Sequence, residues 1–328
     1  MNGVRGGGGG GGVVTLGETM ALMSSDTCGP LQHSRAMTMG IGGSESNVAI
    51  ALRRLGVDVT WIGRVGEDSL GDLVAREIGA EGVAVCAVRD PDAQTGVMIK
   101  ERRTSRQTRV WYYRSGSAGS RLCPADIDPA TIRSAALLHV TGITPALSPS
   151  AADATFTAVN LAREAGVPVS FDLNYRGKLW SAAEAREVYR RLIPLADLVF
   201  AGDGEAEIAV GAGQQPAGGS GMDLAHRLVD AGAGQAIVKL GEHGAVAVVD
   251  GVEYQRSAIT VEALDTVGAG DGFVAGYLAE YLAGESVAVR LTTAVTVGAY
   301  ACLVPGDWEG MPRRSELAGL AATEPVSR

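Results

Sequence analysis

The chain has 328 residues, 46% hydrophobic and 20% charged, enough to build the core of one large α/β domain or of two smaller ones. Its formal charge of −9 at pH 7 argues against sequence-independent binding to nucleic acid or to an anionic membrane. The uncharged run 291–306 is short for a membrane span and is diluted by threonine, so it predicts a buried helix.

The cysteines and histidines are dispersed along the chain, and none are paired at the spacing of a zinc or redox motif. We therefore expect reduced thiols, a cytoplasmic protein and no transition metal held by the chain. His139 stands in an apolar, strand-like run and is expected in the core. The sequence does not open with an apolar segment and a cleavage site, so no export signal is indicated.

The N-terminal part of the chain predicts strands followed by helices. The glycine run within 1–12 precedes the first strand, whereas phosphate-binding glycines follow one, so we expect a flexible N-terminal extension there. Ser44 is a plausible N-cap of a helix with an apolar stripe, which Gly56 closes. The other elements expected here are strands at 13–18 and 57–65, short strands and loops through 20–39, and a helix at 69–78.

Residues 95–114 interrupt this pattern with two β-rich runs, 95–99 and 109–113, around a polar turn, which predicts a hairpin. Alternation along the second run separates its side chains into two faces. A face carrying tyrosine and arginine could close over a polar ligand, and the arginine-rich turn is most simply solvated. The residues concerned are Val110, Tyr112 and Arg114 on one face, Trp111 and Tyr113 on the other, and Arg102, Arg103 and Arg106 in the turn.

After residue 128 strands and helices alternate regularly, which favours a mostly parallel sheet with helices on both faces. Asp250-Gly251 predicts a type I′ turn between two late strands, 245–249 and 252–256. We expect one α/β domain at 13–320, with a small β-sheet lid drawn from about 19–40 and 95–115, and a C-terminal tail at 321–328. The remaining predicted strands are 136–140, 167–172, 196–200 and 236–240, separated by helices near 150–165, 182–192 and 222–231.

The most informative stretch reads Asp265-Thr266-Val267-Gly268-Ala269-Gly270-Asp271-Gly272-Phe273. A β-branched run at 258–261 predicts a strand before it, and apolar residues at helical spacing predict a helix after it. The glycines let the unpaired N–H groups of a helix start approach an anion such as a phosphoryl group. Asp271 adds a carboxylate that could take a proton from a hydroxyl, as phosphoryl transfer requires. The alternative is a tight loop in which Asp271 only caps the helix.

Two more polar clusters follow predicted parallel strands, at the edge where such sheets bind ligands. Asp172, Asn174 and Arg176 come after one strand, and Gly202 and Glu205 come after the next. Taken singly, each cluster is most simply a capped loop, but their shared location favours a site. Asp172 and Glu205 could hold the water shell of Mg²⁺, which prefers oxygen ligands.

Two signatures in the chain resemble those of the ribokinase-like (PfkB) family of carbohydrate kinases. The first is Gly42-Gly43-x-x-x-Asn47-x-Ala49 with Gly63-x-Val65-Gly66-x-Asp68-x-x-Gly71, and the second is 265–273. The resemblance extends from Val13 to about Leu317. Within the family, Tyr112-Tyr113-Arg114-x-Gly116-Ser117-Ala118, 142–148 and Asp172-x-Asn174-Tyr175-Arg176-x-x-Leu179-Trp180 resemble 2-keto-3-deoxygluconate kinases.

This resemblance implies a ribokinase-like α/β fold and ATP-dependent phosphorylation of the terminal hydroxyl of 2-keto-3-deoxygluconate, giving 2-keto-3-deoxy-6-phosphogluconate. Asp271 then matches the general base, and Gly268, Ala269 and Gly270 match the anion hole. The positions that match the substrate site are Gly42, Gly43, Asn47, Met98, Tyr112, Arg114, Arg176, Asp271 and Asp307. Those that match the borders of ATP and its Mg²⁺ are Asn174, Gly202, Glu205, Lys239, Gly241, Gly244, Gly268 and Gly270.

Two positions depart from the family pattern: Gly202 stands where Asn or Ser is frequent, and Met98 where the subgroup often has Tyr. The residues themselves also favour an acidic substrate, because the guanidinium groups of Arg114 and Arg176 are planar forks that suit a carboxylate.

Other interpretations stay open. The chain could phosphorylate another sugar, such as fructose, ribose or 2-keto-3-deoxygalactonate, or it could be a sugar-binding regulator without turnover. A dinucleotide-dependent oxidoreductase is disfavoured, because no G-x-G-x-x-G follows the first strand of a βαβ unit. The expected partners are a small sugar acid and ATP, with no nucleic acid and no membrane. The strand edges of the lid and Trp111 on its outer face predict a homo-oligomer formed through the lid.

Overall fold

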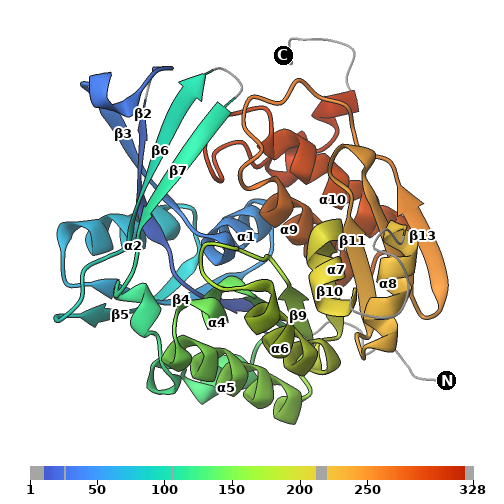
Figure 1. Ribbon diagram of the computed structural model, residues 1–328. Helices are drawn as coiled ribbons and strands as arrows, with labels where there is room; N and C mark the ends of the chain where they lie inside the picture. The colour runs from blue at the N-terminus through green and yellow to red at the C-terminus, as the bar shows by residue number, and fades with distance from the viewer. Residues whose placement is uncertain (1–10, 26, 105–106, 212–219, 322–328) are drawn as a thin grey trace.

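The computed structural model describes residues 11–25, 27–104, 107–211 and 220–321 (Figure 1). Most of the expected N-terminal extension, Arg106 and nearly all of the expected tail lie outside these ranges. Gly11 and Gly12 are described, and both belong to the edge of the fold: each carbonyl accepts a hydrogen bond from the Ala136 N–H at 3.0 Å.

A nine-stranded sheet forms the centre of the molecule, in the order β13-β12-β11-β10-β9-β8-β1-β4-β5. From β11 to β5 all neighbours are parallel, whereas β12 and β13 are antiparallel to theirs. Asp250 and Gly251, with φ of 51° and 75°, form the turn between β12 and β13, which confirms the predicted type I′ turn. The strands are β1 Val13–Leu16, β4 Val59–Gly66, β5 Ala84–Asp90, β8 Leu137–Thr141, β9 Val169–Asp172, β10 Leu198–Gly202, β11 Gln235–Lys239, β12 Ala245–Val249 and β13 Val252–Arg256.

Helices cover both faces of this sheet, as the alternation of strands and helices predicted (Figure 1). None of the helices within the described ranges combines the length and the apolar content that a bilayer crossing needs. One face is covered by α3 Pro129–Arg133, α5 Pro149–Ala165, α6 Ala182–Leu192, α7 Asp203–Val210 and α8 Gly221–Asp230, and the other by α1 Ser44–Arg54, α2 Ser69–Ala80, α9 Ala269–Leu282 and α10 Val287–Ala301; the short α4 Ile143–Leu147 follows β8.

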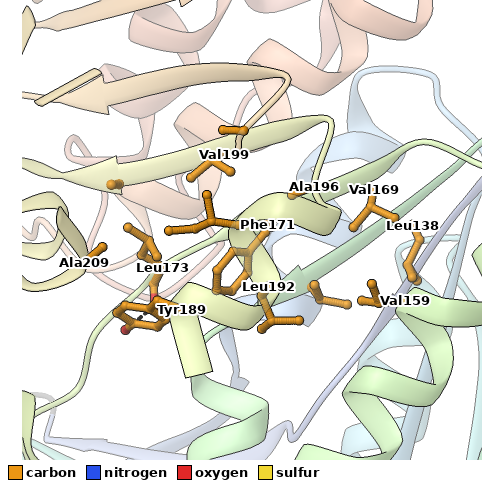
Figure 2. Packing of buried hydrophobic residues seen from close by; sticks show 14 of the residues in the cluster. Leu138, Val159, Val169, Phe171, Leu173, Tyr189, Leu192, Ala196, Val199 and Ala209 are labelled. Carbon is orange, nitrogen blue, oxygen red and sulfur yellow. Dashed lines mark hydrogen bonds between the residues drawn. The ribbon is translucent and has the colours of Figure 1, made fainter. Parts of the chain in front are cut away.

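The core between β9 and α6 shows how tightly the layers pack (Figure 2). Phe171 meets Tyr189 edge to face with ring centroids 5.8 Å apart. The Tyr189 hydroxyl donates a 2.8 Å hydrogen bond to the carbonyl oxygen of Leu173, which satisfies a buried polar group and fixes the chain just beyond the end of β9. His139 is fully buried beside the Ser170 hydroxyl, as its apolar surroundings predicted.

A second, four-stranded sheet, which we call the small sheet, has the order β3-β2-β6-β7 and projects from one side of the body (Figure 1). Its strands are β2 Met20–Ser25, β3 Met37–Gly42, β6 Val97–Thr104 and β7 Gln107–Tyr113. The pairs β2/β3 and β6/β7 are antiparallel, while β2 and β6 are parallel. The predicted hairpin is confirmed, although β6 continues five residues beyond the expected end at Ile99.

One predicted element is wrong: residues 258–261 form no strand. Their β-branched side chains fit a strand, but β13 is the last strand of the large sheet and the chain must leave it there to reach the start of α9. Strand propensity without a neighbour to pair with does not make a strand.

Candidate active site

A cavity of about 1220 Å³ lies between the small sheet and the carboxyl ends of the large sheet's strands. Strand order reverses at β1, which lies between β8 and β4, and ligands of α/β sheets bind at such reversals. The cavity brings together residues that are far apart in the sequence, among them Arg114, Arg176, Lys239, Asp271 and Asp307. Its volume exceeds that of most single-ligand pockets and suits two small molecules.

Asp271 is held in place from the opposite helix. The Ser44 hydroxyl donates to its Oδ1 at 2.7 Å and the Asn47 amide to its Oδ2 at 2.8 Å, while Asn174 in turn donates to the Ser44 hydroxyl at 2.7 Å. Burial raises the pKa of Asp271, and the hydrogen bonds from Asn47 and Ser44 oppose that rise. The result is a buried, oriented carboxylate with more basic character than an exposed one.

This geometry decides two expectations about helix capping. Asp271 lies in the first turn of α9, whose N-cap is Gly268, so the hypothesis that Asp271 only caps the helix is wrong. Ser44 is also not an N-cap: α1 begins at Ser44 with Gly43 before it, and the Ser44 side chain bonds Asp271 instead of the backbone of its own helix.

The start of α9 is shaped for an anion. Gly268 has a φ of 77°, and a Cβ there would overlap the carbonyl oxygen of Asp307, so only glycine fits the turn. The first N–H groups of the helix have no partner within it and carry its positive end. Gly268 and Gly270 line the cavity, whereas the Ala269 N–H turns back to the carbonyl of Thr266 at 3.3 Å.

Lys239 stands beside this helix start. A Cβ on Gly270 would lie 3.7 Å from the Lys239 ammonium, which also contacts both oxygens of Asp172 at 2.8 and 2.9 Å. Burial disfavours the ammonium, but the Asp172 and Glu205 carboxylates outweigh it and raise the pKa of Lys239. Lys239 is therefore a permanent cation at the end of β11, next to the anion-binding turn.

Glu205 and Gly202 join the loops after β9 and β10. One Glu205 oxygen accepts the Gly202 N–H at 2.7 Å and the other accepts the Tyr175 N–H at 3.0 Å. Both residues line the cavity. Gly241 and Gly244, which were predicted to border the nucleotide, are not in the part of the cavity wall that the structure describes, and neither is Ala269.

Arg114 has a partner that the sequence analysis missed. Its Nε donates to Oε2 of Glu18 at 2.7 Å, and the hydroxyl of Ser117 donates to the other Glu18 oxygen. The Glu18 side chain is 1% exposed, so the two charges balance inside the protein. Glu18 follows β1 at the same strand edge as the predicted site residues, and this position was the one signal that could have revealed it.

Arg176 differs from Arg114. It is exposed at the cavity wall, and its NH1 donates to the backbone oxygen of Tyr175 at 3.3 Å. Among the described residues it forms no ion pair. The two arginines expected to bind a substrate carboxylate together are therefore not equivalent, because only Arg176 carries an uncompensated charge.

The remaining predicted substrate residues also line the cavity. Gly42 lies close to two of them, because a Cβ there would overlap the end of the Met98 side chain and an oxygen of Asp307. Tyr112 pairs with Met98 across β6 and β7, so both face the cavity from the small sheet. The carbonyl-type oxygen of the Asn47 side chain is buried and has no hydrogen-bond partner among the described residues, which leaves it available to a ligand hydroxyl.

Comparisons with known proteins identify the family of the chain. The profile described as pfkB family carbohydrate kinase matches residues 12–314. A 2-dehydro-3-deoxygluconokinase of Bacillus subtilis is 36% identical, with 95% of each chain covered, and a 2-dehydro-3-deoxygalactonokinase of Haloferax volcanii is 33% identical, covering 90% of this chain and 92% of the relative. The solved 2-dehydro-3-deoxygluconokinase of Thermotoga maritima superposes with a TM-score of 0.88 at 26% identity, covering 94% of this chain and 97% of that one.

Proposed function

The chain belongs to the pfkB family of carbohydrate kinases, and from this premise we propose that it transfers the terminal phosphoryl group of ATP to the terminal hydroxyl of 2-keto-3-deoxygluconate. The same compound is also called 2-dehydro-3-deoxygluconate, and two of the relatives are named 2-dehydro-3-deoxygluconokinase after it. One observation carries the proposal: a buried carboxylate, Asp271, lies at an anion-binding helix start in the same cavity as Arg176, which has no ion pair among the described residues.

The proposed reaction needs one proton transfer and one displacement. Asp271 accepts the proton of the sugar hydroxyl as that oxygen attacks the γ-phosphorus, and the bond from the γ-phosphorus to the β,γ-bridging oxygen breaks to release ADP. The N–H groups at Gly268 and Gly270 stabilise the charge that develops on the transferred phosphoryl oxygens. Ser44 and Asn47 keep both Asp271 oxygens oriented toward the reacting hydroxyl.

The donor set near the phosphate position fits Mg²⁺ held through water. Lys239 already contacts both Asp172 oxygens, and backbone N–H groups occupy both Glu205 oxygens, so these carboxylates offer remaining lone pairs to coordinated waters more readily than direct bonds. Mg²⁺ keeps several waters and binds through one or two carboxylates together with substrate phosphates. When bound, the ion neutralises charge on those phosphates. Asp172 and Glu205 would hold it.

The carboxylate of the substrate is assigned to the cationic side of the cavity. Arg176 supplies a guanidinium without an ion pair among the described residues, and Arg114 keeps one fork nitrogen, NH1, for which no contact with Glu18 is seen there. Gly42, Gly43 and Asp307 lie around the sugar hydroxyls in this placement, and Tyr112 covers them from the small sheet. Two cationic forks in one pocket favour an acid over a neutral sugar such as fructose or ribose.

A panel assay tests the proposal. The purified protein is incubated with ATP and Mg²⁺ and with matched sugars: 2-keto-3-deoxygluconate, its C4 epimer 2-keto-3-deoxygalactonate, fructose and ribose. ADP release is coupled to NADH oxidation, and the product is identified by mass and NMR. We expect the highest kcat/KM with 2-keto-3-deoxygluconate and phosphate on its terminal carbon. Saturable sugar binding without ADP release would instead favour a silent regulator.

We place the reaction in the cytoplasm and in a homo-oligomer. All four cysteines are free, which suits a reducing compartment. Strand β7 is an edge of the small sheet, and its Trp111 and Tyr113 are about half exposed or more. A second copy that pairs with this edge would bury them. Light scattering of the purified chain measures the assembly, and a monomer at micromolar concentration contradicts this part of the proposal.

A further inference from the structure

Lys100 is a buried ammonium that joins the small sheet to the body. It lies on β6 and is 3% exposed. Its Nζ contacts Asp265 Oδ2 at 2.8 Å, Asp307 Oδ1 at 2.9 Å and the carbonyl oxygen of Gly306 at 3.1 Å. None of these three oxygens belongs to the small sheet: Asp265 opens the turn before α9, and the other two follow α10.

The Asp307 carboxylate is divided between this contact and the cavity. Oδ1 binds Lys100, while Oδ2 lies beside Gly42 at the cavity wall, where a Cβ on the glycine would overlap it. The backbone oxygen of Asp307 packs directly against Gly268, the N-cap of α9. One residue thus contacts the lysine, the cavity and the anion-binding turn at the same time.

We propose that Lys100 is a positioning residue for catalysis: it orients Asp307 toward the sugar and, through Asp265 and Asp307, sets the anion-binding turn according to where the small sheet lies. The inference rests on the proposed function and adds to it a coupling between the position of the small sheet and the geometry of the anion-binding turn. When the small sheet covers the sugar, its Lys100 completes both the sugar contact and the turn that faces the phosphoryl group.

Electrostatics supports the same role. Lys100 faces two carboxylates, Asp265 and Asp307, and Glu309 and Asp271 also act on Asp307. Burial raises the pKa of Asp307 to about 6 even though Lys100 opposes the rise. Without the ammonium the pKa of Asp307 must rise further, so more of the acid would be protonated at a given pH and it would no longer be oriented by a cation.

The test compares Lys100→Met and Lys100→Arg with Arg109→Met, which removes an exposed positive charge from β7 of the same sheet. For Lys100→Met we expect kcat/KM for the sugar to fall by about 10-fold or more, the loss typical of a hydrogen bond to a charged group. Its acid limb should move to higher pH, because Asp307 then titrates at a higher pKa. The dissociation constant of ATP without sugar should rise by less than the sugar kcat/KM falls, because ATP loses only the support of the turn and not the sugar contact of Asp307. Lys100→Arg should recover part of the sugar kcat/KM.

A readout independent of turnover separates this inference from the proposed function. Amide hydrogen exchange at 265–271 and 303–311 should become at least about 10-fold faster in Lys100→Met and stay unchanged in Arg109→Met. Wild-type protein that phosphorylates none of the sugars sinks the proposed function but leaves this comparison intact. Unchanged exchange, or a sugar kcat/KM equal to that of Arg109→Met, overturns the role of Lys100. So does an equal loss of ATP affinity, which indicates general damage to the fold.

Discussion

The cavity has a floor and a rim that are built in different ways. We call the buried residues around Asp271 the cavity floor: Ser44, Asn47 and Asn174 form an unbroken series of hydrogen bonds of 2.7–2.8 Å that ends on its carboxylate. We call Tyr112, Arg176 and Lys178 the cavity rim. These three side chains are exposed, and the hydrogen bonds that Arg176 and Lys178 donate to backbone oxygens are 3.3 Å long.

This difference suits two separate roles, proton transfer at the cavity floor and sugar recognition at the cavity rim. Proton transfer needs one fixed geometry, and a floor that already holds both oxygens of its carboxylate by hydrogen bonds requires no rearrangement of that group when the reaction begins. Recognition of a particular sugar needs side chains with unused hydrogen-bonding capacity, which the rim supplies from a loop and from the small sheet. We therefore expect substitutions in the floor to act on kcat and substitutions in the rim to act on KM.

The largest effect is expected for Asp271→Asn. The amide keeps the size of the side chain but cannot accept the sugar proton, so kcat should fall by about 10²- to 10⁴-fold. In the wild type, activity should rise with pH as Asp271 loses its proton, because only the carboxylate can act as base, and the raised pKa places this limb above the ordinary range of aspartate. The variant should lose the contribution of Asp271 to that limb and keep only the contribution of Asp307. Steady-state kinetics from pH 4 to 9 measures both effects.

Binding and folding provide the control for this variant. Titration with ATP should give a dissociation constant within about 3-fold of the wild-type value, because Asp271 is assigned to the hydroxyl and not to the nucleotide. The melting temperature should not fall, since a buried charge has been removed. A variant that turns over at close to the wild-type rate would show that another group takes the proton.

Arg114 lies near the cavity rim, but it is held by a buried partner, the Glu18 carboxylate, as the residues of the cavity floor are held by theirs. Arg114→Met leaves the Glu18 carboxylate buried without its cation, which should lower the free energy of unfolding by about 3–5 kcal/mol. The double variant Glu18→Gln with Arg114→Met should recover part of that loss, because no charge is then left unpaired. Urea denaturation of the two single variants and the double variant measures the coupling. Additive losses would mean that the pair contributes nothing as a pair.

The fold and the position of Asp271 at the start of a helix were predictable because their signals are local. Strand and helix periodicity identified the parallel sheet and its covering helices, and Asp250-Gly251 identified a turn that requires positive φ at both residues. The glycine-rich turn before α9 likewise carries its own signature, because the backbone there tolerates no other residue at Gly268. Such features depend on neighbours in the sequence, which spacing and composition can show.

The partners of the predicted residues were not predictable in this way. Ser44 bonds Asp271 across 227 positions, Glu18 bonds Arg114 across 96, and Lys100 bonds Asp307 across 207. Nothing in the immediate sequence of these residues distinguishes them from an N-cap or a surface charge. Their roles follow from the register of two sheets and the crossing of helices, so only the folded structure reveals them.

Arg176 gives the strongest test of the rim. Arg176→Met should raise KM for a sugar acid by about 10- to 100-fold, the range expected for a charge-assisted hydrogen bond, while kcat changes little. KM for a neutral sugar should be unaffected, because no carboxylate is present to lose its partner. Arg190→Met, which removes an exposed arginine from α6 outside the cavity, is the matched control. An equal loss on acid and neutral sugars would remove Arg176 from substrate recognition.

The smallest effect is expected at Lys178, which connects the two sides of the rim. Its ammonium lies 5.5 Å from the centre of the Tyr112 ring and donates to the backbone oxygen of Val110, so it holds the loop after β9 against β7. An exposed cation–π contact contributes about 0.5–1 kcal/mol, so Lys178→Met should speed sugar release by about 2- to 5-fold. The rate of the phosphoryl-transfer step should not change.

Stopped-flow measurement of sugar dissociation, combined with Tyr112→Leu in a double-mutant cycle, isolates this contact. Both single variants should speed release, and the double variant should add little, because each substitution already removes the same interaction. Tyr112 also lies 5.9 Å from the Arg114 guanidinium, so its own loss should exceed that of Lys178. If the two effects add in full, Lys178 does not act through Tyr112. The loop after β9 and strand β7 then slow sugar release independently of each other.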